Sequence, residues 1–276
     1  MENKSKYKIL FSDLDHTLLI GQNIPSFNIE AINKLKEKGV KFVICTGRSF
    51  DLMSHLLKEL NTENAENEYT ICNSGSTIYE NKNRKLLFFK GVDNEIVNLV
   101  FEYGKNLKNI LIIFEAFDKP YVYNEDLVDK ERWKDFKYNV MHNIGDLKNK
   151  KIIRILFHAK EKDYLLKIQD EIKNNKIFEG KISYYMSSNF FLEINSFGIC
   201  KGAALKWLCN YLNVDVKDTI AIGDDYNDES MIKEAGLGCC VKSAHDDIKK
   251  ISKYICELDY FEGSVKEVID KFILNN

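Results

Sequence analysis

The sequence predicts an α/β fold in which a parallel-sheet core is interrupted by an inserted α+β domain. Short apolar strands alternate with amphipathic helices over roughly the first eighty residues, and the alternation returns from Lys201 onward. Between these parts, strands follow one another directly, which is typical of antiparallel pairing. A length of 276 residues suits two compact units. We therefore expect a core made of residues 1–84 and 191–276, and an insert made of residues 85–190.

The first part of the core reads as strand, helix, strand, helix, strand. Each expected strand is a short apolar run, and each expected helix shows apolar side chains at helical spacing. Gly39 follows the first helix, where a helix commonly ends. The strands are expected at 6–11, 40–45 and 69–72, and the helices at 27–38 and 50–60.

The insert and the last part of the core have different patterns. In the insert, strands are expected at 86–90, 109–117, 121–123, 151–158, 182–186 and 190–194, with helices at 95–103 and 163–172. In the last part of the core, strands are expected at 219–222, 237–241 and 254–256, with helices at 201–212 and 229–234, another before the last strand and one at the end. The second pattern again indicates a parallel sheet covered by helices.

Composition and charge exclude several classes of protein. Hydrophobic residues make up 45% of the chain and charged residues 30%, which excludes a disordered chain. The net charge of -2 gives no basic field, so we expect no nucleic-acid partner and no membrane binding. The short apolar run before Asp13 is no signal peptide or membrane span, and we expect a cytoplasmic protein.

The cysteines do not indicate thiol chemistry. The chain has 7 of them without a CxxC pair, which favours reduced thiols in the core. A cysteine phosphatase carries arginine six residues after its nucleophile. Asp51 occupies that position after Cys45, and Ile78 occupies it after Cys72.

Two carboxylates, Asp13 and Asp15, follow the first expected strand. Ligands bind at this edge in open α/β sheets, beyond the carboxyl ends of the strands. Two carboxylates among apolar neighbours repel each other and lose hydration, and a divalent cation relieves both effects. A solvated acidic turn is the alternative, because Asp is common in turns.

Three further residues suit the binding of phosphate. Thr46 and Gly47 follow the second strand and present a hydroxyl and a backbone N–H at the same edge of the sheet. A tight turn followed by a Ser49 helix cap is the alternative. Lys201 begins an expected helix, where a cation opposes the helix dipole by ~0.3–1 kcal/mol unless an anion lies nearby. A solvated lysine is the alternative.

The segment from Gly223 to Asp228 carries three aspartates directly after an apolar strand. So much negative charge at one strand end indicates a metal site. Mg²⁺ prefers oxygen ligands and keeps several waters, so two or three carboxylates shared with Asp13 and Asp15 are sufficient. For Asp228, a place in the first turn of the next helix is the alternative.

Five segments together resemble the haloacid dehalogenase (HAD) superfamily, in particular its Cof-type phosphatases of the capped subfamily IIB. They are DLDHTLL at 13–19, CTGRS at 45–49, CNSG at 72–75, LEINSFGICKGAAL at 192–205 and GDDYND at 223–228. The match spans both ends of the chain, and its specificity comes from the five segments occurring in this order. The resemblance implies a Rossmann-like parallel-sheet HAD core with an inserted α+β cap domain of the C2 type.

The resemblance also implies a role for each matching residue. Asp13 is the expected nucleophile, and Asp15 is the expected acid/base, held protonated by nearby negative charge. Phosphate contacts are expected from the backbone at Leu14 and from Thr46, Gly47, Lys201 and Asn227. Mg²⁺ is expected on Asp13, on the backbone carbonyl of Asp15 and on Asp224, with Asp228 in support.

The sequence departs from the family pattern at two places. His16 stands where this family usually has glycine, and we expect its ring to point outward. Val241–Ala244 stands where relatives usually carry a Gly-Asn-Ala segment, next to the expected metal loop.

These residues predict a Mg²⁺-dependent phosphatase that hydrolyses small phosphorylated metabolites, sugar phosphates first, through an aspartyl phosphate. We expect a monomer or a weak homo-oligomer. One alternative is a phosphomutase or phosphotransferase that uses the same site. The other is a phosphometabolite-binding regulator with little turnover, which His16 and Ser243 suggest.

Overall fold

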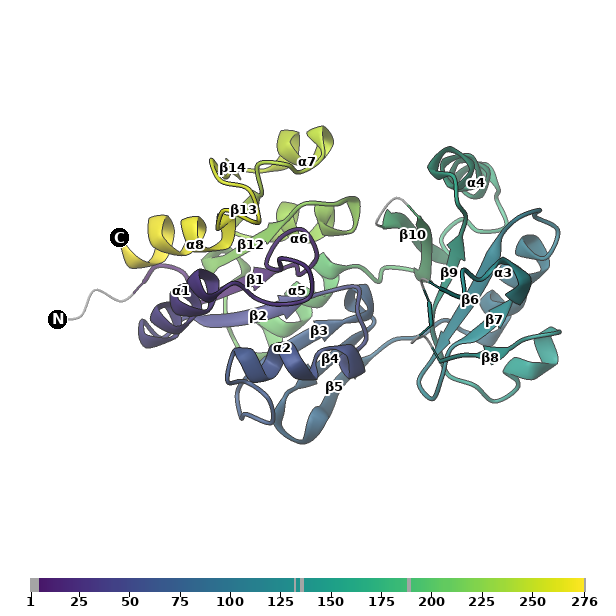
Figure 1. The fold of residues 1–276 in the computed structure, drawn as a ribbon, viewed down its shortest axis with the longest axis horizontal. Helices are drawn as coiled ribbons and strands as arrows, with labels where there is room; N and C mark the ends of the chain where they lie inside the picture. Colours follow the sequence, from purple (N-terminus) through teal and green to yellow (C-terminus); the bar gives the residue numbers. More distant parts are fainter. Residues whose placement is uncertain (1–4, 132, 135–136, 188–189, 276) are drawn as a thin grey trace. The chain divides into compact units, whose positions relative to one another are not determined.

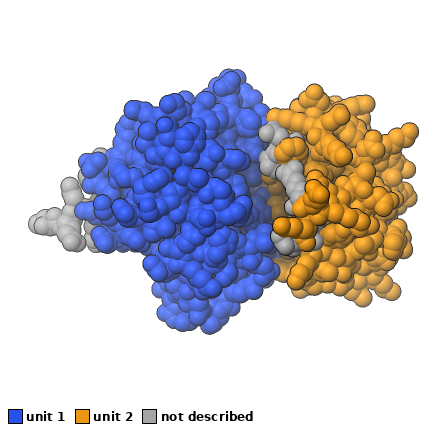
Figure 2. All heavy atoms as spheres, viewed as in Figure 1, with its two compact units in different colours: residues 1–89, 200–276 blue, residues 90–199 orange. Residues whose placement is uncertain are grey.

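The computed structural model shows a chain that folds into two compact units (Figures 1 and 2). The core unit comprises residues 1–89 and 200–276, and the inserted unit comprises residues 90–199. The structure describes residues 5–131, 133–134, 137–187 and 190–275.

The core unit is built on an eight-stranded sheet with strand order β14-β13-β12-β1-β2-β3-β4-β5. The strands from β14 to β3 run parallel, and β4 and β5 add an antiparallel hairpin at one edge. The strands are β1 Ile9–Ser12, β2 Lys41–Cys45, β3 Tyr69–Cys72, β4 Thr77–Glu80, β5 Lys85–Phe89, β12 Thr219–Gly223, β13 Leu237–Cys240 and β14 Tyr254–Ile255.

Helices cover both faces of this sheet (Figure 1). Alternate residues of a strand point to opposite faces, so Leu10 packs in the cluster that includes α1, whereas Ile9 and Phe11 pack in the cluster that includes α5. The helices are α1 Ser26–Glu37, α2 Ser54–Glu59, α5 Lys201–Tyr211, α6 Glu229–Glu234, α7 Asp246–Ile251 and α8 Ser264–Ile269, with short helical turns η1 Phe50–Leu52, η2 Asn73–Gly75 and η7 Tyr226–Asp228. Burial on both faces explains the continuous apolar runs of the strands.

The sheet order reverses at β1. From β1 the chain continues to β2 and β3 on one side, and it later returns to β12, β13 and β14 on the other side. In register, Ser12 lies opposite Ile222, so the ends of β1 and β12 are neighbours. Open α/β sheets bind ligands at such a reversal, because the loops that leave the two strands diverge and open a crevice.

The inserted unit is built on a six-stranded sheet with strand order β10-β11-β9-β6-β7-β8. Strands β7 and β8 pair in parallel, and the other neighbours pair antiparallel. The elements are α3 Asn94–Gly104, β6 Leu111–Ala116, β7 Tyr121–Tyr123, β8 Asn139–Val140, β9 Ile152–His158, α4 Lys162–Asn174, β10 Ile182–Ser187 and β11 Phe191–Ser196. Gly104 lets α3 approach this sheet, because a Cβ there would lie 2.7 Å from Ile112 Cδ1.

The two sheets confirm the predicted fold class, a parallel-sheet core with an inserted and mostly antiparallel domain. The compact units meet at 89/90 and 199/200, whereas the sequence placed the junctions at 84/85 and 190/191. Strand pairing accounts for the difference. β5 pairs with β4 in the core sheet, and β11 pairs with β9 and β10 in the inserted sheet.

Three local predictions differ from the structure. β4 and β8 were not predicted, because strands of four and two residues carry little periodic signal. The helix expected at 50–60 is divided into η1 and α2. Across the described part of the chain, no helix has both the length and the apolar character needed to cross a bilayer.

Candidate active site

The first two site residues follow the adjacent strands β1 and β12. Asp13 comes directly after β1, and its backbone N–H donates to the carbonyl of Ile222 in β12 at 3.0 Å. Asp224 comes directly after β12. The parallel sheet thus brings together two carboxylates that are far apart in the sequence, at the place where its strand order reverses.

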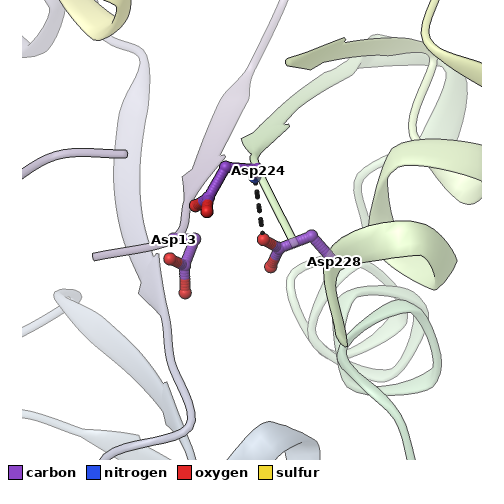
Figure 3. A group of neighbouring side chains, drawn as sticks. All are labelled: Asp13, Asp224 and Asp228. Atoms are coloured by element: carbon purple, nitrogen blue, oxygen red, sulfur yellow. Dashed lines mark hydrogen bonds between the residues drawn. The ribbon is translucent and has the colours of Figure 1, made fainter. Parts of the chain in front are cut away.

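Asp228 completes a group of three carboxylates (Figure 3). One oxygen from each of Asp13, Asp224 and Asp228 lies within 4.8 Å of the others. The helical turn η7 brings Asp228 back toward the end of β12, where its Oδ2 accepts from the backbone N–H groups of Asp224 at 3.0 Å and Asp225 at 3.1 Å. The hydroxyl of Thr17 donates to Oδ1 of Asp224 at 2.7 Å. The carboxylates of Asp224 and Asp228 are therefore held by donors on the loops that follow β1 and β12.

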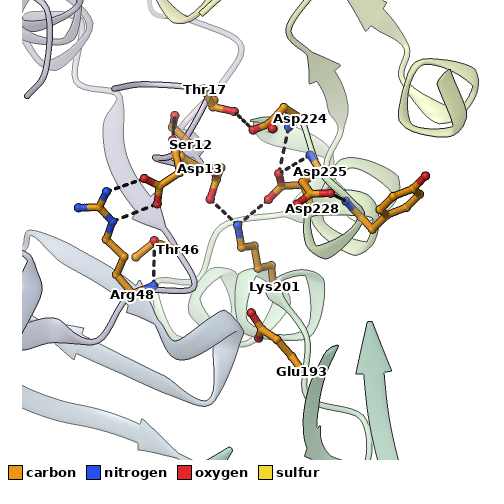
Figure 4. A network of polar contacts seen from close by, with 12 residues as sticks. Ser12, Asp13, Thr17, Thr46, Arg48, Glu193, Lys201, Asp224, Asp225 and Asp228 are labelled. Carbon is orange, nitrogen blue, oxygen red and sulfur yellow. Dashed lines mark hydrogen bonds and ion pairs between the residues drawn. The ribbon is translucent and has the colours of Figure 1, made fainter. Parts of the chain in front are cut away.

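Lys201 joins two of these carboxylates (Figure 4). It is the first residue of α5, and its side chain is fully buried. Its Nζ donates to Oδ1 of Asp13 at 2.5 Å and to Oδ1 of Asp228 at 2.6 Å. Burial by itself lowers the pKa of Lys201, but the attraction of Asp13 and Asp228 outweighs it and raises this pKa well above the usual range. The ammonium is therefore charged, and the alternative of a solvated lysine is excluded.

The group carries more negative charge than Lys201 balances. Burial, the nearby Asp228 and Asp15 together raise the pKa of Asp13 to about 8, against the lowering effect of Lys201. Burial also raises the pKa of Asp224, and the charges of Asp13 and Asp228 add to the effect. Burial is the largest cause of both raised pKa values, and the repulsion between the carboxylates adds to it. A bound cation would reduce that repulsion, and carboxylate oxygens are ligands that hard divalent cations accept.

The carboxylate of Asp15 lies against Arg48 and outside the group of three. Arg48 Nε donates to Oδ2 of Asp15 at 3.0 Å, and Nη2 donates to Oδ1 at 2.5 Å. The sequence predicted that nearby negative charge holds Asp15 protonated, whereas here a guanidinium donates to both of its oxygens. Arg48 received no role from the sequence, although it lies in the CTGRS segment that follows β2.

The loop after β2 is held by the CNSG segment after β3. Thr46 is buried, and its hydroxyl oxygen accepts from the backbone N–H of Arg48 at 3.1 Å. The carbonyls of Thr46 and Arg48 accept from the backbone N–H groups of Ser74 and Asn73, both at 3.0 Å. Asn73 and Ser74 have left-handed φ values of 50° and 54°, which turn their N–H groups toward the loop. This loop therefore has a fixed shape beside Asp13.

The remaining predicted phosphate contacts lie on the same loops. Leu14 is buried, and its carbonyl accepts from the N–H groups of Thr17, Leu18 and Leu19, which turns the chain back after β1. Gly47 lies between Thr46 and Arg48, and Asn227 lies in η7, directly before Asp228. Their roles toward phosphate remain predictions.

The sequence profile of the haloacid dehalogenase-like hydrolases matches residues 10–269 of this chain. The chain belongs to this family. Its core sheet with an inserted, mostly antiparallel cap sheet is the architecture of the Cof-type, subclass IIB members.

Named relatives include two phosphatases. The phosphoglycolate phosphatase of Methanobrevibacter smithii is 29% identical over 264 residues, which is 95% of this chain and 97% of the relative. The 5-amino-6-(5-phospho-D-ribitylamino)uracil phosphatase YcsE of Bacillus subtilis is 27% identical over 264 residues, with 95% and 94% covered. The structure of the subclass IIB sugar phosphatase BT4131 aligns with a TM-score of 0.79 at 21% identity, covering 96% of this chain and 98% of that chain, and so shows a common fold.

The two departures from the family pattern have structural explanations. His16 has a φ of 58°, a left-handed conformation that glycine adopts most easily, which explains a glycine at this position in other members. Its ring is exposed, as expected, and lies nearly perpendicular to the ring of Tyr260 with the two ring centres 5.3 Å apart. In the segment 241–244, the hydroxyl of Ser243 donates to Asp259 at 2.5 Å. Just beyond it, the N–H of His245 donates to the carbonyl of Asp224 at 3.3 Å.

Proposed function

We propose that this protein is a phosphatase that hydrolyses small phosphate monoesters, sugar phosphates first, with Asp13 as the nucleophile. The observation that carries the proposal is the buried Asp13 carboxylate, which lies at the reversal of strand order between Lys201 and two further carboxylates. Family membership and the two relatives named as phosphatases support it. Their named substrates are both small monoesters, and the BT4131 structure is that of a sugar phosphatase.

In the first half-reaction, a carboxylate oxygen of Asp13 forms a bond to phosphorus while the bond from phosphorus to the leaving oxygen breaks. Lys201 holds Oδ1 of Asp13, which orients the carboxylate for attack. For this step Asp15 must carry a proton and turn one oxygen away from Arg48. It gives that proton to the leaving oxygen, so the product is an alcohol and an aspartyl phosphate. The covalent intermediate divides one difficult hydrolysis into two easier steps.

In the second half-reaction, water attacks the phosphorus of the aspartyl phosphate and gives a proton to Asp15. The bond between phosphorus and Asp13 breaks, which releases inorganic phosphate and restores the Asp13 carboxylate. Asp15 ends the cycle with the proton that it gave away in the first half. One side chain therefore serves as acid and then as base.

The charge of the phosphoryl group is held by donors on the three loops. We assign this role to the ammonium of Lys201, the hydroxyl of Thr46, the backbone at Leu14 and Gly47, and the side chain of Asn227. The hydrogen bond from the backbone N–H of Arg48 to the hydroxyl oxygen of Thr46 fixes that hydroxyl and leaves its proton available for donation. Donors that are already in place stabilise the transition state without reorganisation.

A divalent cation, Mg²⁺ by preference, fits the same group. Asp13, Asp224 and the backbone carbonyl of Asp15 would hold it, with Asp228 fixing the loop around Asp224. When bound, the cation neutralises carboxylate and phosphoryl charge so that two anions can meet. The fit rests on the geometry of the carboxylates, because one oxygen from each of Asp13, Asp224 and Asp228 lies within 4.8 Å of the others.

A panel of phosphorylated metabolites, assayed for released phosphate with Mg²⁺ and with a chelator, tests the proposal. We expect Mg²⁺-dependent release from several sugar phosphates and little release with the chelator. Repeating the assay with an added sugar separates hydrolysis from phosphoryl transfer, because a phosphotransferase would form a new phosphate ester. Ligand binding without release of phosphate under any condition would contradict the proposal and favour a binding regulator.

A further inference from the structure

The first turn of α5, which carries Lys201, is capped by a residue of another helix. The first N–H groups of a helix have no acceptor within that helix, so each needs one from outside. For Gly202, which follows Lys201, the acceptor is the hydroxyl oxygen of Ser230 in α6, at 3.0 Å. Ser230 therefore fixes the backbone next to the buried lysine.

Close packing of the backbone brings this hydroxyl within reach. A Cβ at Gly202 would lie 2.5 Å from the carbonyl oxygen of Ser230, so α5 and α6 can approach this closely only with a glycine here. Directly before Lys201, the carbonyl oxygen of Cys200 would lie 2.5 Å from a Cβ at Gly75. The backbone on both sides of Lys201 is therefore in contact with other elements of the core unit.

Ser230 also lies close to one of the two carboxylates that hold the lysine. It is two residues after Asp228, whose Oδ1 accepts from Lys201 at 2.6 Å. The hydrogen bond to Ser230 therefore joins the backbone next to Lys201 to the backbone near Asp228. A lysine side chain is flexible, so the place of its ammonium depends on where its backbone and its partners are held. Without this hydrogen bond, α5 and α6 are free to shift along each other, and the distances from the ammonium to its partners change.

We propose that Ser230 is a positioning residue, which holds the start of α5 against α6 so that the Lys201 ammonium keeps its place between its two carboxylates (Figure 4). The inference rests on the proposed function, in which Lys201 orients Asp13 and holds phosphoryl charge. Groups that stabilise a transition state must be held within about 0.5 Å of the productive geometry by the residues around them. Ser230 lies outside the five segments that carry the family resemblance, so nothing else assigns it a role.

The same two helices offer a matched control. Lys206 Nζ of α5 donates to Oε1 of Glu234 in α6 at 2.9 Å, and both side chains are exposed. Lys206 and Glu234 each lie one turn further along their helix than the residues of the first hydrogen bond. Lys206→Met therefore weakens the contact between the same helices away from the ammonium. If Ser230 only holds the two helices together, the two changes should have similar effects.

The test compares Ser230→Ala, which removes the acceptor, with Ser230→Thr, which keeps the hydroxyl. We expect Ser230→Ala to lower kcat on 4-nitrophenyl phosphate by about three- to tenfold, which is the usual effect of one hydrogen bond. The KM should stay within about twofold, because other donors also bind the phosphate group. Ser230→Thr and Lys206→Met should both keep kcat within about twofold. All rates are measured well below the Tm of each variant, so that unfolding does not contribute.

Inhibition by vanadate and by inorganic phosphate separates positioning from stability. Vanadate adopts the five-coordinate geometry of phosphoryl transfer, whereas inorganic phosphate resembles the bound product. An analogue of the transition state loses affinity together with kcat. In Ser230→Ala, the inhibition constant of vanadate should therefore rise by about three- to tenfold, and that of phosphate should change by less than about twofold. A purely structural change lowers the Tm and leaves this ratio unchanged.

Each outcome decides the inference. An unchanged kcat in Ser230→Ala, an unchanged ratio of the two inhibition constants, or an equal loss of kcat in Ser230→Thr or Lys206→Met would overturn the role of Ser230 while the proposed function stands. Unmutated protein that releases phosphate from 4-nitrophenyl phosphate and from no other ester on the metabolite panel would still test the role of Ser230. Unmutated protein that releases phosphate from none of them would overturn the proposed function and this inference with it.

Discussion

Each unit of this protein buries one cation between two carboxylates, yet the two clusters differ in their surroundings. In the inserted unit, Arg154 of β9 pairs with Glu115 of β6 and with Glu193 of β11, the latter at 2.9 Å. These residues lie on three adjacent strands, and strand pairing places Glu115 directly opposite Arg154. In the core unit, Lys201 pairs with Asp13 and Asp228 at the ends of strands, where loops begin.

The two clusters differ in their balance of charge and in their position within the sheet. Arg154 keeps its charge, because Glu115 and Glu193 outweigh the lowering effect of burial and raise its pKa. At the core cluster, Asp224 adds a third carboxylate, and burial raises the pKa of Asp13 to about 8. A buried cluster on paired strands with two carboxylates for one cation suits a structural role, whereas three carboxylates for one cation at a reversal of strand order suit the binding of a cation and chemistry.

Replacing the expected nucleophile should give the largest effect on activity. Asp13→Asn keeps the size of the side chain but removes the charge that attacks phosphorus, so phosphate release should fall by about 10³-fold or more. Thermal unfolding should show that the variant remains folded. Glu193→Gln, the matched change in the other cluster, should retain most of its activity per folded molecule. An Asp13→Asn variant with most of its activity would remove Asp13 as the nucleophile.

Breaking the cluster of the inserted unit should mainly affect stability. Arg154→Met leaves Glu115 and Glu193 buried without their cation, and we expect a loss of about 3–5 kcal/mol in the free energy of unfolding. Urea unfolding measures this loss. The triple variant that also carries Glu115→Met and Glu193→Met removes the unpaired charges and should recover most of it. A loss below about 1 kcal/mol in Arg154→Met would show that water reaches this cluster.

The surplus charge of the core cluster should make stability depend on pH. Because folding raises the pKa values of Asp13 and Asp224 above the usual value of about 3.9, the folded state binds more protons than the unfolded state. The contribution of these two groups to the free energy of unfolding is then greatest at low pH, and it falls as pH rises toward about 8, the pKa of Asp13. In the presence of a chelator, we expect the Tm to fall by several degrees as the pH is raised from low values to about 8.

Mg²⁺ should reduce this fall, because the cation displaces the protons and binds the charged carboxylates. The gain in Tm on adding Mg²⁺ should therefore be larger at pH 8 than at pH 5. Asp13→Asn should flatten the profile measured with the chelator, whereas Glu193→Gln should leave its slope unchanged. A Tm that rises with pH in the chelator would contradict the surplus of charge.

The parts of the fold that could be predicted from the sequence are those that repeat. Alternating strands and helices specify a parallel sheet, and parallel sheets bring the carboxyl ends of their strands to one edge. The meeting of Asp13 and Asp224 follows from this rule. The domain junctions were harder, because β5 and β11 lie next to the junctions and only strand pairing shows which sheet each of them joins.

What the sequence could not show is where long side chains point. The bond from Arg48 to Asp15 joins two loops, and its formation depends on side-chain directions that no spacing encodes. The same holds for Ser230, whose hydrogen bond with Gly202 depends on how closely two helices pack. Asp228 was expected in support of the metal loop, and its two bonds to backbone N–H groups suit that role, although its carboxylate also lies within the group of three.

The smallest effect should come from the hydroxyl that holds Asp224. Thr17→Val keeps the shape of a fully buried side chain but removes its 2.7 Å bond to Asp224. A carboxylate that loses such a partner binds a cation less well, so the Mg²⁺ concentration for half-maximal activity should rise by about tenfold. Thr17→Ser keeps the hydroxyl and should stay near the unmutated protein. If Thr17→Val changes only the Tm and not the Mg²⁺ requirement, Asp224 does not bind the cation, and the contrast between the two clusters would rest on Asp13 alone.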